Sequence, residues 1–297
     1  MARGPRERTA PDGLVVVDKP QGLTSHDVVA RVRRLAGTRK VGHAGTLDPM
    51  ATGVLLVGVE RATRLLGRLA LTDKAYDATI RLGVTTVTDD AEGDVLLEVD
   101  AAQVTDEAVA IGVRALTGDI EQRPSSVSAI KVDGVRSYAR VRAGEDVALP
   151  TRPVTVSCFD VRDIRRDGAV LDLDVTVVCS SGTYVRALAR DLGAGLGVGG
   201  HLTALRRTRV GPFGLEAGHT LSQLAESFVL LPLVDVVAAS YARVEVDDET
   251  AVAVLHGGRI PVPAGIDGPA GVFGPDGRVL SVTEVRDGLL VPLVVFS

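Results

Sequence analysis

The segment 42–53 places one carboxylate in a glycine-rich setting, with the sequence GHAGTLDPMATG. Asp48 precedes Pro49, which disfavours helical backbone for the residue before it, and the nearby glycines allow a close approach of backbone to a ligand. A carboxylate held in such an extended, defined pose suits catalysis. It equally suits an ordinary turn, in which the Asp side chain accepts hydrogen bonds from nearby amides. The spacing alone leaves both interpretations open.

Arg186 is a candidate partner for that carboxylate. It follows the sequence SGTYV, in the first turns of a helix expected to begin near Gly182 and Thr183, where a cation faces the positive end of the helix dipole. Local rules of this kind often fail at functional sites. An ionised Asp48 in a closed pocket needs a nearby cation to offset its desolvation. The alternative is a surface arginine whose stem lies along apolar neighbours.

The elements that position these residues indicate an α+β fold. Hydrophobic patterning predicts strands at 14–17, 54–59, 76–82, 154–161 and 169–179, with a hairpin signal at 166–168. It predicts helices from the Thr24-Ser25 cap to Gly37, at 62–70, at 105–117 and in a stretch that runs to residue 231. Because strands and helices do not alternate as in a doubly wound parallel sheet, we expect a largely antiparallel mixed sheet.

The chain of 297 residues is long enough for two domains. We expect a flexible basic tail at 1–13, a first domain at 14–239, and a small β-barrel or sandwich at 240–297 with turn signals at Asp276-Gly277 and Asp287-Gly288. The segment 122–152 has few apolar anchors. It is either a surface loop or a functional insertion.

Composition excludes several classes of protein. No apolar run reaches the length of a membrane span, and residues 1–13 lack the apolar core of a signal peptide, so we expect a cytoplasmic protein without a membrane partner. Cys158 and Cys179 are expected to be buried thiols of a reduced compartment. The five histidines have no metal-ligand spacing, so no metal site is predicted.

The formal net charge of −5 hides two basic patches, which set local attraction to phosphate. One lies at 31–40 and includes Arg31, Arg34 and Lys40; the other includes Arg206 and Arg207. Both are either solvated faces or contacts with a nucleic-acid backbone. Residues 241–297 carry four arginines and eight acids, which puts an RNA contact by that region in doubt.

Five segments in this order resemble the TruB family of bacterial tRNA pseudouridine-55 synthases. They are DKPQGLTS at 18–25, the segment 42–53, KAY at 74–76, SGTYVR at 181–186 and LRR at 205–207. The resemblance extends to about Phe213. It implies the pseudouridine synthase fold with a C-terminal PUA-like domain. It also implies cofactor-free isomerisation of one uridine in the T-loop of tRNA, with 122–152 as an RNA-gripping insertion.

The resemblance also implies roles for individual residues. Asp48 acts at the sugar, either by covalent attack or by taking a sugar proton, and Arg186 pairs with it. The target uridine must be flipped out of its stack. Tyr76 would stack on the base and is a candidate proton acceptor, while His43 would hydrogen-bond RNA or fill the vacated stack. The remaining assignments are Tyr184 and Leu205 to the base pocket, Arg31, Arg34, Lys40, Arg206 and Arg207 to the RNA backbone, and Lys19-Pro20 to structural support of Asp48.

Two functions of different classes remain open at this point. One is the enzyme, acting on the T-arm of tRNA as a monomer without a guide RNA. The other is a tRNA-binding folding helper in which catalysis is secondary. Asp48 distinguishes them, because a pure RNA binder has no reason to keep a carboxylate facing anionic RNA. A guide-RNA-dependent isomerase is a weaker third hypothesis.

Overall fold

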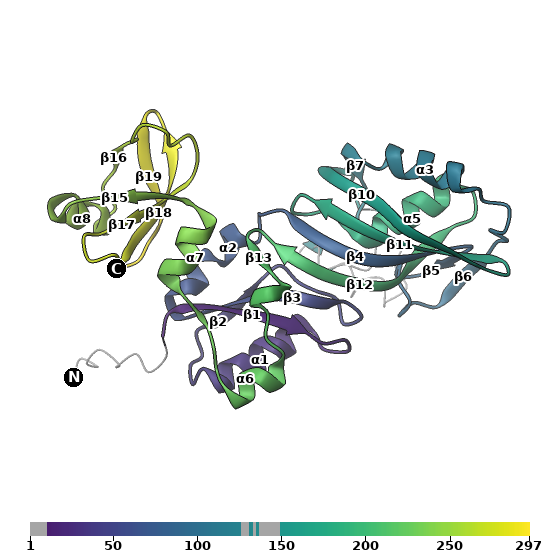
Figure 1. Cartoon of the computed structure of the whole chain (residues 1–297), viewed down its shortest axis with the longest axis horizontal. Coiled ribbons are helices and arrows are strands. Elements are labelled where there is room, and N and C mark those ends of the chain that lie inside the picture. The colour runs from purple at the N-terminus through teal and green to yellow at the C-terminus, as the bar shows by residue number, and fades with distance from the viewer. Residues whose placement is uncertain (1–10, 126–130, 133–134, 137–148) are drawn as a thin grey trace.

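The computed structural model describes residues 11–125, 131–132, 135–136 and 149–297 (Figure 1). Most of the predicted tail 1–13 and of the insertion 122–152 therefore lies outside the described residues. Gly13 belongs to strand β1 and not to a flexible tail. Asp12, just before it, forms an ion pair of 2.6 Å with Arg61.

One large curled sheet organises the first part of the chain. Its strand order is β14-β1-β3-β12-β4-β11-β10-β7, with β2 paired to β3 and β13 paired to β12. The β12–β3 pair is parallel and the other described pairs in this sheet are antiparallel. This confirms the predicted α+β fold with a largely antiparallel mixed sheet. The strands are β1 (Gly13–Lys19), β2 (Val41–Ala44), β3 (Thr52–Val59), β4 (Lys74–Leu82), β7 (Gly118–Gln122), β10 (Arg152–Asp167), β11 (Val170–Cys179), β12 (Gly200–Val210), β13 (Phe213–Gly214) and β14 (Leu231–Pro232).

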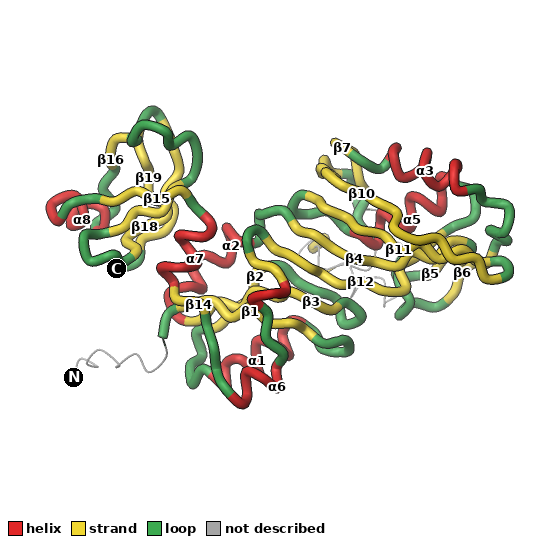
Figure 2. The backbone as a smooth tube through the Cα atoms, viewed as in Figure 1, coloured by secondary structure: helices red, strands yellow, loops and turns green. Residues whose placement is uncertain are grey.

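Helices and two-stranded ribbons surround this sheet (Figure 2). The helices are α1 (Ser25–Leu35), η1 (Glu60–Leu65), α2 (Leu66–Leu69), α3 (Asp106–Ala115), α5 (Val185–Gly195), η2 (Leu215–Ala217), α6 (Leu221–Glu226) and α7 (Leu233–Ser240). The ribbons are β5 (Val84–Thr86) with β6 (Val95–Glu98), and β8 (Lys131–Val132) with β9 (Val135–Arg136).

Local sequence signals explain several element boundaries. The Thr24 side chain accepts from the Asp27 amide and Asp27 caps Thr24 in return, which makes a capping box at the start of α1. Gly37, with φ of +64°, follows the end of that helix. Thr105 caps α3, and its side chain accepts from the Ala108 amide without a reciprocal bond. The predicted hairpin between β10 and β11 is present, and Gly168 supplies a positive φ in its turn.

Other boundaries differ from the sequence prediction. The expected helix at 62–70 is a 3₁₀ turn, η1, followed by the single turn α2. The helical stretch expected to reach residue 231 breaks after α6, and β14 intervenes before α7. Strands β2 and β12 were not predicted, although β12 joins β3 to β4 in the middle of the sheet.

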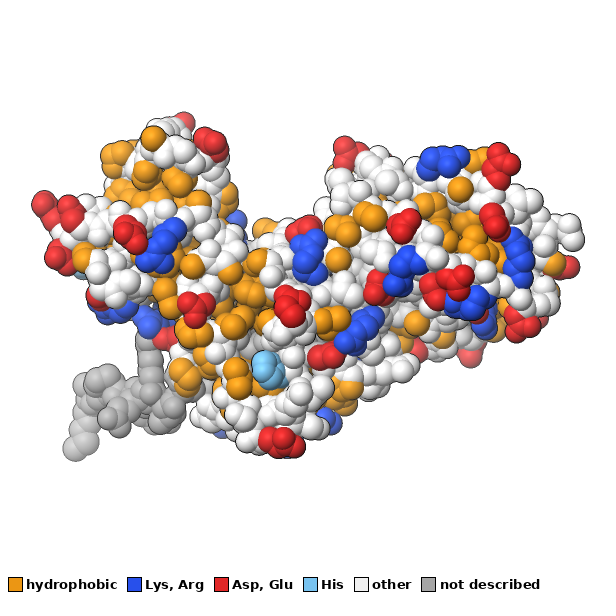
Figure 3. Space-filling view, in the orientation of Figure 1, with side chains coloured by type: hydrophobic (Ala, Val, Ile, Leu, Met, Phe, Trp, Pro, Cys, Tyr) orange, Lys and Arg blue, Asp and Glu red, His pale blue; other side chains and the backbone are white. Residues whose placement is uncertain are grey.

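The α5 side of the sheet carries the main hydrophobic core. Alternate residues of β4 and β11, such as Ile80 and Val175, pack there with the apolar faces of α1, α3 and α5. The opposite faces of β4 and β11 carry polar residues in cross-strand ion pairs, among them Arg81–Asp172 at 2.7 Å. Figure 3 shows basic and acidic side chains interspersed over these strands. In β4 and β11 the sheet is therefore covered on one side and half-exposed on the other, whereas β1 and β3 are buried on both faces.

The C-terminal residues form a second sheet, of order β15-β17-β18-β19-β16, which is consistent with the predicted PUA-like domain. Its strands are β15 (Ala242–Glu245), β16 (Ile260–Pro261), β17 (Ala270–Phe273), β18 (Val279–Arg286) and β19 (Leu289–Val295). The predicted turns contain Gly277 and Gly288, both with positive φ. Helix α8 (Asp248–Leu255) was not predicted; Asp247 caps it.

This second sheet shares a hydrophobic core with the first. Phe273 and Phe296 belong to the same buried cluster as Leu14 of β1 and Val236 of α7. Arg64 of η1 also donates to the carbonyl of Val295 in β19. The two parts of the chain are therefore packed together through apolar contacts, and the loss of one part exposes apolar surface on the other.

We predict that Phe273→Ala lowers the free energy of unfolding by about 3–5 kcal/mol, because a fully buried aromatic ring is lost from the shared core. Hydrogen exchange should show reduced protection in β1 as well as in β17. Val252→Ala, at a site 59% exposed in the same domain, is the matched control with little effect. Unchanged protection of β1 in Phe273→Ala would show that the two domains are energetically independent.

Candidate active site

The loop between β2 and β3 presents Asp48, and a buried serine holds it in place. Ser25, at the start of α1, donates from Oγ to the Leu47 carbonyl at 3.0 Å and accepts from the Leu47 amide at 2.9 Å. The Ala51 amide donates to the Asp48 carbonyl at 3.1 Å. These bonds fix the backbone on both sides of Asp48, whose side chain stays 39% exposed and open to a ligand.

Lys19 supports the same loop from behind. Its side chain is fully buried, and Nζ donates to the carbonyls of Leu23 at 2.7 Å, Pro20 at 3.0 Å and Pro49 at 3.3 Å. Burial lowers the pKa of Lys19 to about 8, and the charge of Asp48 opposes that shift. The geometry agrees with the structural role that the sequence suggested for Lys19.

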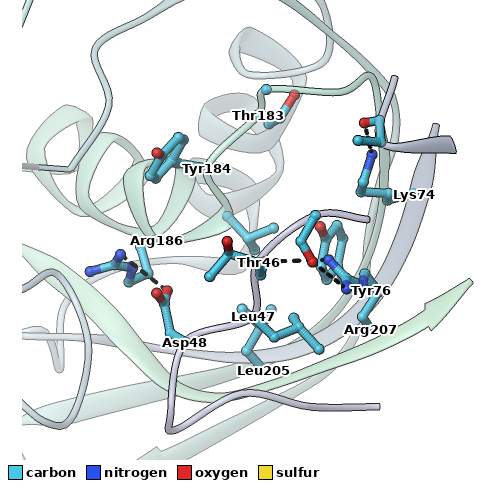
Figure 4. Close-up of a pocket in the computed structure, with 14 residues that line it drawn as sticks. Thr46, Leu47, Asp48, Lys74, Tyr76, Thr183, Tyr184, Arg186, Leu205 and Arg207 are labelled. Carbon is cyan, nitrogen blue, oxygen red and sulfur yellow. Dashed lines mark hydrogen bonds and ion pairs between the residues drawn. The ribbon is translucent and has the colours of Figure 1, made fainter. Parts of the chain in front are cut away.

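Arg186 lies in the first turn of α5 and points at Asp48 (Figure 4). Its Nη2 is 3.0 Å from Oδ2 of Asp48, so the pairing expected from the sequence is present. Its Nη1 is 3.2 Å from Oδ2 of Asp90 and donates to the carbonyl of Thr88 at 2.8 Å. The guanidinium is only 5% exposed, so these partners determine its position.

Asp90 is a site residue that the sequence analysis missed. It is almost fully buried, and it is held by the Thr88 hydroxyl and by the Glu92 amide, which donates at 3.1 Å. The adjacent Asp89 has a positive φ of 59°, which is uncommon for a residue with a side chain. The available signal was the acidic run TDDAEGD at 88–94, although such runs usually lie in solvated turns.

A pocket of about 270 Å³ opens beside Asp48 and Arg186. Three predicted base-contacting residues, Tyr76, Tyr184 and Leu205, line it together with that pair (Figure 4). Its volume is close to the lower end of small-molecule sites, so it suits a single nucleoside and not a stack of bases. The remaining lining residues are Gly45, Thr46, Leu47, Ala70, Lys74, Gly182, Thr183, Val185 and Arg207.

Tyr76 and Tyr184 occupy different environments in this pocket. Burial raises the pKa of the Tyr76 phenol, and the charge of Arg207 opposes the shift. Tyr184 is the N-cap of α5, where its amide donates to Oε1 of Gln122 at 2.8 Å and its carbonyl accepts from Nε2 of Gln122 at 3.1 Å. The Arg152 guanidinium lies 4.9 Å from the Tyr184 ring centroid. Gln122, which is fully buried, was not predicted to take part in the site.

His43 does not line the pocket. It lies on β2, opposite Val57, and its ring meets that of His26 edge-to-face with centroids 5.5 Å apart. Burial and then the charge of His26 lower the pKa of His43, so the neutral ring is favoured. Its buried Nδ1 has no hydrogen-bond partner among the described residues.

The five residues predicted to contact RNA backbone fall into two groups. Arg31, Arg34 and Lys40 are exposed, as a backbone contact requires. Arg206 is partly exposed and pairs with Asp18 through two bonds of 3.0 and 2.8 Å.

Arg207 differs from the expected backbone contact. It is 1% exposed, and its Nε donates to the Val54 carbonyl at 2.7 Å while its Nη2 donates to the Gly45 carbonyl at 3.1 Å. It faces the pocket because the alternation of β12 puts it on the same face as Leu205 and on the opposite face from Arg206.

The part of the chain that the structure describes has neither a metal-binding cluster nor a membrane-spanning helix. No group of three or more His, Cys, Asp or Glu side chains there could hold a metal ion. No helix in that part of the chain is long and apolar enough to cross a membrane.

Comparison with known proteins identifies one family over most of the chain. Residues 33–185 match the N-terminal domain of TruB family pseudouridylate synthases. Residues 186–232 match the tRNA pseudouridylate synthase B C-terminal domain, and residues 241–297 match the C-terminal domain of tRNA pseudouridine synthase II.

Among curated proteins, the tRNA pseudouridine synthase B of Streptomyces griseus is 60% identical over 296 residues, which cover 98% of this chain and 99% of that protein. The protein of the same name from Thermobifida fusca is 61% identical over 290 residues, covering 96% and 99%.

Solved structures give the same fold. A Cbf5-Nop10-Gar1 complex contains a chain that aligns with a TM-score of 0.74 and 27% identity, over 99% of this chain and 87% of that one. An H/ACA RNP bound to a substrate RNA containing 2′-deoxyuridine gives a TM-score of 0.71 and 26% identity, over 99% and 88%. From these matches, the chain belongs to the TruB family of pseudouridine synthases.

Proposed function

We propose that this protein isomerises uridine to pseudouridine at position 55 in the T-loop of tRNA, without a cofactor. The single observation that carries the proposal is the Asp48–Arg186 ion pair of 3.0 Å at a nucleoside-sized pocket. The names of the 60% identical relatives supply the substrate class, and the family resemblance supplies the position in tRNA.

The reaction begins with a uridine that has been flipped out of its stack into the pocket. Asp48 faces the sugar and acts in one of two ways: it bonds to C1′ or it removes the C2′ proton. In both cases the N1–C1′ bond breaks and its electron pair passes to the uracil ring. The base then turns and C5 bonds to C1′, which releases the Asp48 carboxylate from C1′ or is accompanied by return of the proton to C2′. C5 loses its proton and N1 gains one, so that no oxidation or reduction occurs. Arg186 holds the carboxylate in place for each step.

The walls of the pocket suit the base. The Tyr76 ring offers an aromatic face for stacking, and Leu205 on the neighbouring strand β12 offers an aliphatic contact. The Tyr76 hydroxyl is the candidate acceptor of the C5 proton. Tyr184 closes the pocket at the start of α5. We assign His43 to the space that the flipped base leaves in the RNA.

The proposed partner is the T-arm of tRNA, bound without a guide RNA by a monomer in the cytoplasm. The exposed basic residues of α1 and of the following turn, Arg31, Arg34 and Lys40, would contact phosphates. A folding helper without catalytic activity would bind the same RNA through the same basic patch. Substitution of Asp48, and not of the basic patch, therefore distinguishes the two functions.

We predict that Asp48→Asn binds unmodified tRNA about as well as the intact protein but forms no detectable pseudouridine, because the amide keeps the shape and loses the nucleophile or base. Pseudouridine mapping at single-nucleotide resolution after incubation with a transcript is the measurement. The wild-type protein should modify position 55 alone and need no added cofactor. Turnover by Asp48→Asn would refute the assigned role, and modification of another position would refute the proposed specificity.

A separate prediction concerns the basic patch. Replacing Arg31, Arg34 and Lys40 together by Gln should weaken tRNA binding and reduce the slope of log affinity against log salt by up to about 3, one per lost phosphate contact. The single-turnover rate at saturation should change little. The matched control replaces Arg114, Arg165 and Arg166, which are exposed at the α3 end of the sheet and carry the same charge. Equal salt slopes for the two triple variants would contradict this interface.

A further inference from the structure

Two buried cations line the pocket on the side away from Asp48 (Figure 4). Lys74 is 7% exposed and Arg207 is 1% exposed. They lie on the neighbouring strands β4 and β12, where Arg207 is opposite Tyr76 and Lys74 is opposite Val210. The pocket thus has the carboxylate at one end and two positive charges at the other, with Tyr76 between them.

Neutral groups satisfy the hydrogen bonds of these cations without cancelling their charge. Lys74 Nζ donates to the carbonyls of Ala70 at 2.9 Å and Thr72 at 2.7 Å. Arg207 donates to backbone carbonyls, as described above. None of the ion pairs between described residues includes either side chain. The nearest acid in sequence, Asp73, is paired with Arg209 at 2.7 Å.

The positive charge is concentrated in a small space around Gly45. A Cβ on Gly45 would lie 3.6 Å from both Lys74 Cε and Arg207 Nη1, and this glycine has φ of +80°. Burial lowers the pKa of Lys74 to about 8, and Arg207 is the largest charge that adds to the shift. Burial of two cations without a counter-ion lowers the stability of the folded protein. Proteins usually keep such unfavourable groups at functional sites, where a ligand can compensate the charge.

The proposed reaction supplies such a counter-ion in this pocket. When the N1–C1′ bond breaks, its electron pair delocalises over N1, O2 and O4 of the uracil ring. With the sugar at Asp48, the ring extends past Tyr76 toward the two cations. The phosphates of the flipped nucleotide stay with the RNA backbone at the mouth of the pocket, so they are less suited to this buried end.

We propose that Lys74 and Arg207 form an anion subsite that stabilises the uracil anion while its glycosidic bond to the ribose is broken. This inference rests on the proposed function. It makes Lys74 a group that contacts the reacting base, in addition to a residue that caps the end of α2. Preorganised donors of this kind act on charge that develops in the transition state, so they affect the rate of the chemical step more than tRNA binding.

A substrate whose leaving base is more acidic distinguishes a catalytic role of Lys74 from a structural role. A fluorine at C5 makes the uracil anion more stable and therefore less dependent on external stabilisation. Lys74→Gln keeps a donor for one carbonyl and removes the charge. In single-turnover assays in mildly acidic buffer, it should slow consumption of the target uridine by on the order of 100-fold. Consumption of 5-fluorouridine at the same tRNA position should slow by less than about tenfold, and Lys74→Arg should recover part of the rate on uridine.

The matched control is Lys19→Met, because Lys19 is also a buried lysine bonded to carbonyls but does not line the pocket. Lys19→Met should lower the rate by the same factor for uridine and for 5-fluorouridine, because Lys19 supports the Asp48 loop. Nucleoside chromatography after nuclease digestion measures substrate loss whatever product forms. An equal loss on both substrates for Lys74→Gln, with its melting temperature unchanged, would overturn the proposal.

A measurement on the unaltered protein covers the case in which Lys74→Gln does not fold. The wild-type chain should bind 5-nitrouracil, whose ring is anionic at neutral pH, at least about tenfold more tightly than neutral uracil, or about 1.4 kcal/mol. Equal or weaker binding of the anion would overturn the subsite. Failure of the wild-type protein to modify tRNA at all would refute the proposed function instead, and thus the two failures are distinguishable.

Discussion

The site depends on one guanidinium that is shared between two carboxylates. Arg186 lies 3.0 Å from Asp48 and 3.2 Å from Asp90, which come from different loops, while the arginine itself begins α5. Its position at the positive end of a helix dipole is unfavourable by itself, and the two carboxylates offset that cost. Because Asp90 is almost fully buried and Asp48 is partly exposed, Asp90 is suited to hold the arginine and Asp48 to act on a substrate.

The surrounding elements fix the positions of Asp48, Asp90 and Arg186 relative to one another. Ser25 and Lys19 hold the backbone of the Asp48 loop, and Gln122 holds the start of α5 through the Tyr184 backbone. Each of these polar side chains is buried and bonded to main chain, so each would be costly to remove. The rigidity of the site thus comes from side chains bonded to loop backbone. The sheet supplies the floor on which Tyr76, Leu205 and Arg207 lie.

Much of this organisation was predictable from the sequence, because its signals are local. The Thr24 cap, the hairpin at Gly168 and the Pro49 restriction on Asp48 each depend on a few adjacent residues. The pairing of Asp48 with Arg186 was predictable only by resemblance, since 138 positions separate them. Asp90 was missed because an acidic run resembles a solvated turn until the tertiary structure buries it.

Strand β12 shows why the remainder could not be predicted. Its two consecutive arginines suggested a basic surface patch, yet the sheet places Arg206 beside Asp18 and Arg207 against the pocket. The alternation of a strand assigns opposite faces to adjacent residues, but which face is buried depends on the neighbouring strands β3 and β4. The shared core between the two domains likewise comes from long-range packing of Phe273 and Phe296, which short windows of sequence do not report.

The most direct test of the shared-arginine account is a double-mutant cycle of Asp90→Asn and Arg186→Lys, read as the single-turnover rate of pseudouridine formation at saturating protein. If Asp90 acts by holding Arg186 on Asp48, the two losses are not additive. The coupling free energy should then be at least about 1 kcal/mol. Losses that add to within roughly 0.5 kcal/mol would show that Asp90 and Arg186 act independently and would contradict the account.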